Sequence, residues 1–233
     1  MKLVFLVFMV LAAVSPLAAQ SSSCKVGVAA APVGFWTWAP ESTINVYIVE
    51  SDFKPHELEY LLAPLSPWNA VSEATGSGVK FEYKGFVNRP LYCENCLTIV
   101  RGPVFDKSKR YLTELRTYSA AKNRIMTWAT IVIDPLLTNP KTLTNALVHE
   151  LGHSFGLLDC YSCKQDSTVM IQFKSVNVSN NMDRPSACDV AQVKLAYQTL
   201  AAQLKRVKQT PPLAVDEGEE PVDDDTPVVI RRP

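Results

Sequence analysis

Two histidines and a glutamate lie close together in the second half of the chain, in the pattern His149-Glu150-x-x-His153. On a helix, residues i and i+4 lie one turn apart on the same side, so both imidazoles can point at one ion. Two convergent imidazoles supply two of the three protein ligands of a catalytic zinc site. Glu150 would then lie beside the ion as a base that takes a proton from water, not as a ligand.

A third ligand is expected shortly after the helix. Asp159 lies six residues beyond His153, with Gly156 halfway between them. Glycine adopts positive φ readily, so Gly156 can end the helix and turn the chain back toward the ion. The chain's other histidine, His56, lies far upstream in a polar segment and is expected to be exposed. We therefore predict Asp159 as the third ligand, although a bare H-E-x-x-H also occurs by chance in structural helices.

The longer run H-E-L-G-H-S-F-G-L-L-D, residues 149–159, resembles the signature of the metzincin zinc peptidases. Aspartate in the final place is similar to the snapalysin-type branch of that clan. Metzincins also carry a methionine turn beneath the zinc, and Ser167-Thr168-Val169-Met170 resembles one. The resemblance implies a zinc endopeptidase with one catalytic ion, Glu150 as general base, and Gly156 and Met170 as structural support. The sequence offers no support for a structural calcium ion.

The helix that must carry the two histidines has a recognisable start. Asn139 can cap its first turn, and Pro140 suits the first helical position. Leu143, Leu147 and Leu151 form one stripe, roughly opposite the histidines. We expect this stripe to pack against a core while the other face holds the metal.

The remaining elements indicate an α+β fold. Alternating or β-rich stretches predict five strands, at residues 43–50, 79–83, 97–100, 111–120 and 125–134. Pro55 is expected to open a helix that Pro64 and Pro67 interrupt, and a last helix is expected over residues 186–207. By resemblance, the domain would be a mixed twisted sheet with two main helices above the cleft, a C-terminal helix below it and zinc between them. The resemblance also implies that residues 113–120 form the rim that pairs with an extended peptide substrate.

Four segments are expected along the chain. Residues 1–19 carry one lysine, an apolar run too short to span a bilayer comfortably and small residues, which is typical of a secretory signal peptide. Residues 20–42 have no clear period and fit either a short propeptide or an N-terminal strap packed on the domain. Residues 43–207 form the catalytic domain, and residues 208–233 are an acidic, proline-rich tail expected to be disordered.

Six cysteines agree with export, because secreted chains oxidise such even-numbered sets. They are Cys24, Cys93, Cys96, Cys160, Cys163 and Cys188, and the sequence does not choose among their pairings. Two C-x-x-C pairs leave a four-cysteine structural zinc site as a rival interpretation.

The distribution of charged residues, together with the motifs that are missing, limits the classes of partner that we expect. The whole chain is neutral, but residues 20–208 hold 20 basic and 16 acidic residues, because seven acidic residues lie in the tail. The sequence has no glycine-rich phosphate loop, no basic-aromatic nucleic-acid patch and no second membrane segment. We expect a secreted, extracytoplasmic monomer that acts on a protein or peptide substrate, binds no nucleic acid and has no integral membrane association once the signal peptide is removed. A catalytically silent binding protein on the same scaffold is the alternative, although the presence of Glu150 favours an enzyme.

Overall fold

The computed structural model describes residues 24, 26–28, 37–104, 113–119, 125–171 and 182–209. The expected signal peptide, residues 1–19, and residues 210–233 of the acidic tail lie outside this part. The described part holds five strands and four α-helices, with two short 3₁₀ turns after the first strand. In chain order the elements are β1 (Thr43–Val49), the turns Glu50–Asp52 and Pro55–Glu57, α1 (Leu58–Leu62), α2 (Leu65–Thr75), β2 (Lys80–Val87), β3 (Cys96–Arg101), β4 (Thr113–Ser119), β5 (Met126–Ile133), α3 (Pro140–Ser154) and α4 (Ala187–Gln209).

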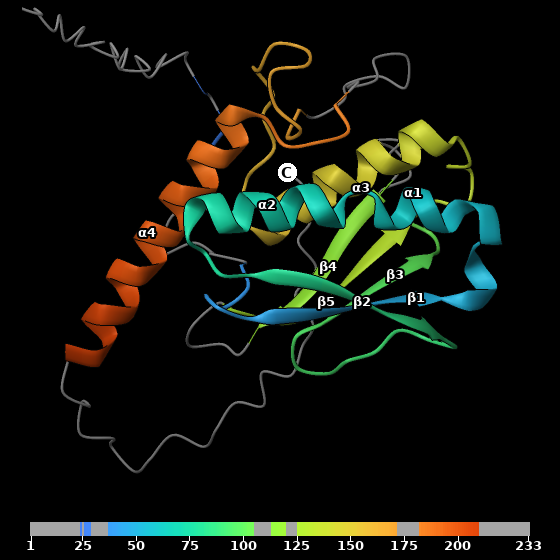
Figure 1. The fold of residues 1–233 in the computed structure, drawn as a ribbon, viewed down its shortest axis with the longest axis horizontal. Helices are drawn as coiled ribbons and strands as arrows, with labels where there is room; N and C mark the ends of the chain where they lie inside the picture. Colours follow the sequence, from blue (N-terminus) through green and yellow to red (C-terminus); the bar gives the residue numbers. More distant parts are fainter. Residues whose placement is uncertain are drawn as a thin grey trace, which may run out of the picture.

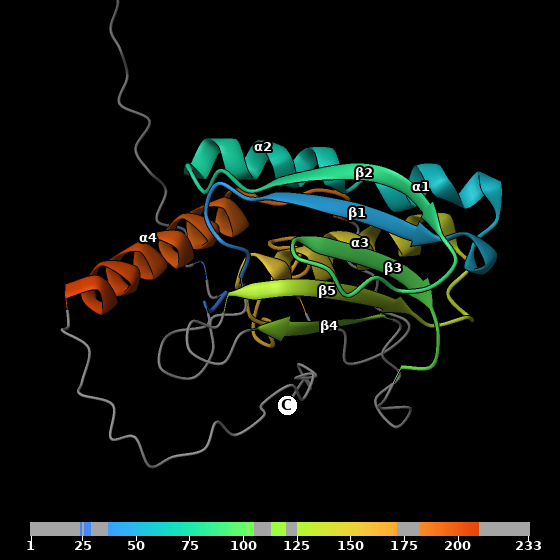
Figure 2. The ribbon, with the colours of Figure 1, turned by 90° about the horizontal axis from the view of Figure 1, so that it is seen from below.

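The strands form one mixed sheet in the order β2-β1-β3-β5-β4. The first four of these strands are parallel, and β4 pairs antiparallel with β5 at one edge. Helices α1, α2 and α3 lie on one face of the sheet, and α4 lies at one end of this layer (Figures 1 and 2). The predicted class, an α+β fold with a mixed sheet and helices packed on it, is confirmed.

The core lies between the sheet and α3. Leu143, Leu147 and Leu151 are almost completely buried, so the stripe predicted from their spacing does pack inward. Trp68 of α2 stacks on Phe155 with ring centroids 5.0 Å apart, and its indole nitrogen donates to the carbonyl of Val148 at 2.9 Å. The helix that carries the histidines is therefore held against both the sheet and α2.

Two sequence-based boundaries need correction. Pro64 and Pro67 do not merely interrupt a helix: α1 ends at Leu62, and the chain starts again at once as α2, with Pro64 as its N-cap and Pro67 in its first turn. Proline is tolerated there because the first-turn N–H groups have no partner inside the helix. The second strand extends to Val87 instead of ending at Tyr83, since β2 pairs with β1 along its whole length.

The six cysteines, all within the described residues, form three disulfides. Cys24 joins Cys188, and each C-x-x-C pair closes on itself: Cys93 joins Cys96 and Cys160 joins Cys163. This pairing leaves no thiolates for a four-cysteine zinc site, so that rival interpretation is wrong. Within the part of the chain that the structure describes, no helix has both the length and the apolar character needed to cross a bilayer.

Candidate metal centre

Helix α3 presents His149 and His153 on the same side. Asn139 caps the helix, since its side-chain oxygen accepts from the N–H of Thr142 at 3.1 Å, as its sequence position predicts. The two imidazoles follow one turn apart, with ring centroids 4.8 Å from each other. His56, in contrast, is exposed in the short turn before α1 and takes no part in this cluster.

The chain turns back at Gly156, whose φ is +83°. The N–H of Gly156 donates to the carbonyl of His153, and the N–H of Leu157 donates to the carbonyl of Gly152. This pair of bonds is a Schellman motif, which needs a left-handed residue after the helix and therefore favours glycine. The turn brings Asp159 back against the histidine face of α3.

The three predicted ligands lie together. The Oδ1 atom of Asp159 is 3.0 Å from Nε2 of His149 and 3.4 Å from Nε2 of His153. Among the described residues, these three form the single cluster of histidine, cysteine and acidic side chains compact enough to hold a metal ion. The cluster is mostly shielded from solvent, with all three side chains no more than 12% exposed.

The orientation of each ring is set by its other nitrogen. Nδ1 of His149 lies 2.8 Å from the carbonyl oxygen of Val169, and Nδ1 of His153 lies 2.8 Å from that of Leu157. A carbonyl only accepts hydrogen bonds, so each Nδ1 carries a proton, and each Nε2 faces Asp159, where it can hold either a metal ion or a second proton.

This arrangement fits a cation. Two imidazole lone pairs and a carboxylate oxygen, all electron-rich, need positive charge between them, supplied by protons on the rings or by a metal ion. Histidines whose Nδ1–H groups are fixed by carbonyl oxygens are the usual form of histidine metal ligands. Burial alone would raise the pKa of Asp159, but the imidazoles of His153 and His149 hold it well below its usual value of 3.8. Asp159 is therefore ionised at neutral pH, as a ligand must be.

Glu150 is completely buried next to His149 on α3. Its carboxylate lies outside the compact cluster formed by the two histidines and Asp159.

Met170 packs against the helix that carries the histidines. It is fully buried, and its sulfur packs against Gly152, one residue before His153. The carbonyl of Met170 accepts from the N–H of Cys160 at 2.7 Å, and the disulfide from Cys160 to Cys163 closes the loop that follows Asp159. The segment resembling a methionine turn is thus tied by backbone to the ligand loop.

Part of the N-terminal segment borders the same loop. Val28 forms an antiparallel bridge with Leu157, and the N–H of Leu158 donates to the carbonyl of Gly27 at 3.0 Å. The disulfide from Cys24 to Cys188 attaches this stretch to α4. These contacts involve only residues 24–28 of the segment 20–42, and the choice between propeptide and strap stays a prediction.

Sequence reasoning missed three contributions to the site. Gly152 leaves space for the sulfur of Met170, the carbonyl of Val169 fixes His149, and the buried carboxylate of Asp189 holds the segment that contains Val169. A signal existed for Asp189, because Ser186-x-x-Asp189 has the spacing of a helix capping box. No local signal marks the carbonyl of Val169, which belongs to the backbone.

Comparisons with known proteins give little beyond this geometry. No protein-family model matches the chain, and no curated protein is significantly similar to it in sequence. Among solved structures, the chain is similar to archaemetzincin from Methanopyrus kandleri, with a TM-score of 0.43 and 13% identity, over 67% of this chain and 96% of that one.

Proposed function

We propose that this chain is a secreted zinc endopeptidase. The observation that carries the proposal is the convergence of two Nε2 atoms and one carboxylate oxygen, with both Nδ1 atoms bonded to backbone carbonyls. Two histidines and one carboxylate are a donor set of catalytic zinc, which keeps a further position for water or substrate. Calcium, which prefers six to eight oxygen ligands, suits this set poorly.

A zinc ion held by His149, His153 and Asp159 would supply Lewis acidity toward a water molecule and a substrate carbonyl. Glu150 performs the proton transfers: it accepts a proton from the attacking water and passes it to the leaving amine. Glu150 is completely buried and directly precedes the turn that leads to His153, so it is shielded from bulk water on the helix that carries the histidines. Met170 and Gly156 act only by holding the ligands in place.

A protein or peptide substrate is supported by the position of β4 at the edge of the sheet. Strand β4 is the edge strand beyond β5, and it lies next to α3. An edge strand can bind an extended peptide by backbone hydrogen bonds without demanding particular side chains. The rim that the metzincin resemblance implies, residues 113–120, overlaps β4, which pairs antiparallel with β5.

Secretion is supported by two observations. The first 19 residues have the composition of a secretory signal peptide. Three disulfides also suit an oxidising compartment, since cytosolic proteins keep their thiols reduced.

The proposal is tested by zinc content and casein hydrolysis, measured on the purified protein and on its Glu150→Ala variant. We expect one zinc ion per chain in both and hydrolysis only in the unmodified protein. Glu73→Ala, which removes an exposed glutamate of α2, is the matched control and should retain full activity. Zinc in both proteins without hydrolysis in either would favour the catalytically silent binding protein, and absence of zinc from both would refute the site.

A further inference from the structure

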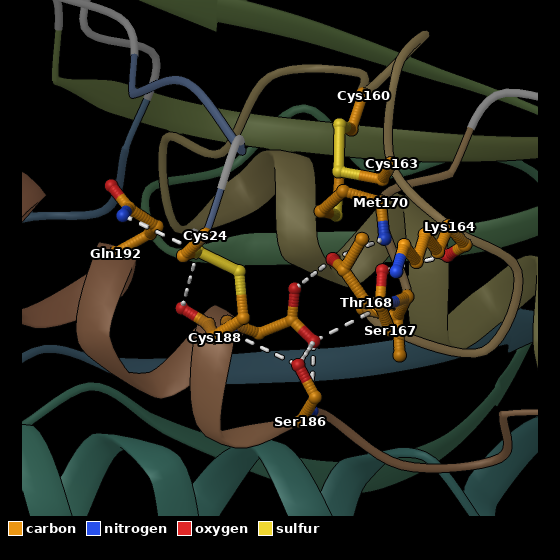
Figure 3. The surroundings of a disulfide bond; sticks show 12 residues. Cys24, Cys160, Cys163, Lys164, Ser167, Thr168, Met170, Ser186, Cys188 and Gln192 are labelled. Carbon is orange, nitrogen blue, oxygen red and sulfur yellow. Dashed lines mark hydrogen bonds between the residues drawn. A yellow bond between two sulfur atoms is a disulfide. The ribbon is translucent and has the colours of Figure 1, made fainter. Parts of the chain in front are cut away.

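Asp189, near the start of α4, is a buried carboxylate with no part in the proposed chemistry. Its Oδ1 atom accepts from the hydroxyl of Thr168, and its Oδ2 atom accepts from the N–H of Val169 at 3.1 Å. Thr168 in turn accepts from the N–H of Met170 at 3.0 Å. Figure 3 shows this network between the start of α4 and the segment of Thr168 and Met170.

The other side of Val169 faces the metal centre. Its carbonyl oxygen accepts from Nδ1 of His149 at 2.8 Å, while its N–H donates to Asp189. A single residue thus links the buried carboxylate of α4 to a predicted ligand on α3. Because Val169 is also buried, no water competes readily for these bonds.

Asp189 has a second, purely structural set of bonds. Its Oδ2 atom accepts from the N–H of Ser186 at 2.7 Å and from the Ser186 hydroxyl at 2.8 Å, and Ser186 Oγ accepts from the N–H of Asp189 at 3.2 Å. These are the reciprocal bonds of a capping box at the start of α4. The hydroxyl of Thr168 contacts the same carboxylate but lies outside the capping box, so the two roles can be separated by substitution.

We propose that Asp189 and Thr168 are positioning residues for metal binding by His149. They fix the Val169 peptide, and the Val169 carbonyl fixes the tautomer and the direction of the imidazole. This inference rests on the proposed zinc function. Groups that orient a metal ligand in this way typically change metal affinity by about 10- to 100-fold when they are removed.

The test compares Thr168→Val, Thr168→Ser and Ser186→Ala in the purified protein. Zinc affinity is measured by competition with a chromophoric chelator, and the ligand geometry by the visible absorption of the cobalt-substituted protein. We expect Thr168→Val to weaken zinc binding about tenfold or more and to shift the cobalt bands, and Thr168→Ser to restore both. Ser186→Ala should lower the denaturation midpoint and leave the affinity and the cobalt spectrum unchanged.

Wild-type affinity and spectrum in folded Thr168→Val would overturn the inference and leave Asp189 with a capping role alone. If Thr168→Val does not fold, Asp189→Asn provides the second test, because it keeps the side-chain shape and one acceptor oxygen; unchanged zinc affinity there would also refute the inference. Failure of the metal site itself looks different, since the unmodified protein would then bind no zinc, and both proposals would fall together. Zinc binding without hydrolysis would count against the proposed enzyme and leave this inference to be decided by the affinities.

Discussion

The sulfur of Met170 packs so closely against Gly152 that a Cβ at position 152 would overlap it. The same Cβ would lie 3.2 Å from the ring of Trp68. Gly152 stands between Glu150 and His153, so the glycine inside the motif allows the Met170 side chain to approach the backbone of α3. This contact joins the two segments on which the metal-site hypothesis depends.

Gly152→Ala is expected to destabilise the protein by about 1–3 kcal/mol, the usual cost of adding atoms to a well-packed core. In an ordinary helix, the same change would stabilise by about 1 kcal/mol. Urea unfolding of the variant and the parent protein measures the change in the free energy of unfolding. Gly102→Ala is the control, because a Cβ there meets only an ordinary contact with Val132. A Gly152→Ala variant as stable as the parent would show that Met170 does not constrain α3.

Zinc is expected to stabilise the folded protein, because it binds the assembled site and not the dispersed ligands of the unfolded chain. At a zinc concentration about 1,000 times the Kd, the gain is about 4 kcal/mol. The shift in thermal midpoint between chelator and zinc measures it. Glu150→Ala should keep this shift and His153→Ala should lose most of it; equal shifts in the two variants would contradict the separate roles of base and ligand.

The acid sensitivity of the metal-free protein should depend on Asp159. Its folded-state pKa lies below the usual 3.8, so its ionised form stabilises the fold above that value, and the contribution is lost as the pH falls through the folded-state pKa. Asp159→Asn removes this contribution. In chelator, the unfolding free energies of the two proteins should therefore differ most near neutral pH and converge below pH 3.8. A constant difference across that range would disprove the linkage.

The three disulfides should contribute unequally to stability. The bond between Cys24 and Cys188 closes a sequence separation of 164 residues, whereas Cys93 and Cys96 are separated by three. Loop-closure entropy predicts a loss of about 4–5 kcal/mol when the long-range bond is replaced by two serines, and about 2 kcal/mol for the short one. Guanidinium unfolding of the two double variants tests this order, and an equal loss in both would exclude the entropic explanation.

Local sequence patterns determined much of the metal centre. The spacing of His149 and His153, the turn at Gly156 and the cap at Asn139 depend on helix periodicity and on the backbone freedom of single residues. The structure places all three as the patterns predict, and it brings Asp159 to the histidines. The strand positions followed from side-chain patterns in the same way, with small shifts at their ends.

Only the tertiary structure decided how distant segments meet. Three contacts join residues at least 20 positions apart: the disulfide between Cys24 and Cys188, the hydrogen bond between His149 and the carbonyl of Val169, and the hydrogen bond between Thr168 and Asp189. Such contacts depend on how the helices pack on the sheet. The Val169 carbonyl is a backbone atom and the cysteine pairing is a choice among several, so residue types alone do not predict either of them. The sequence by itself determined which side chains could hold a metal; packing decided what holds those side chains.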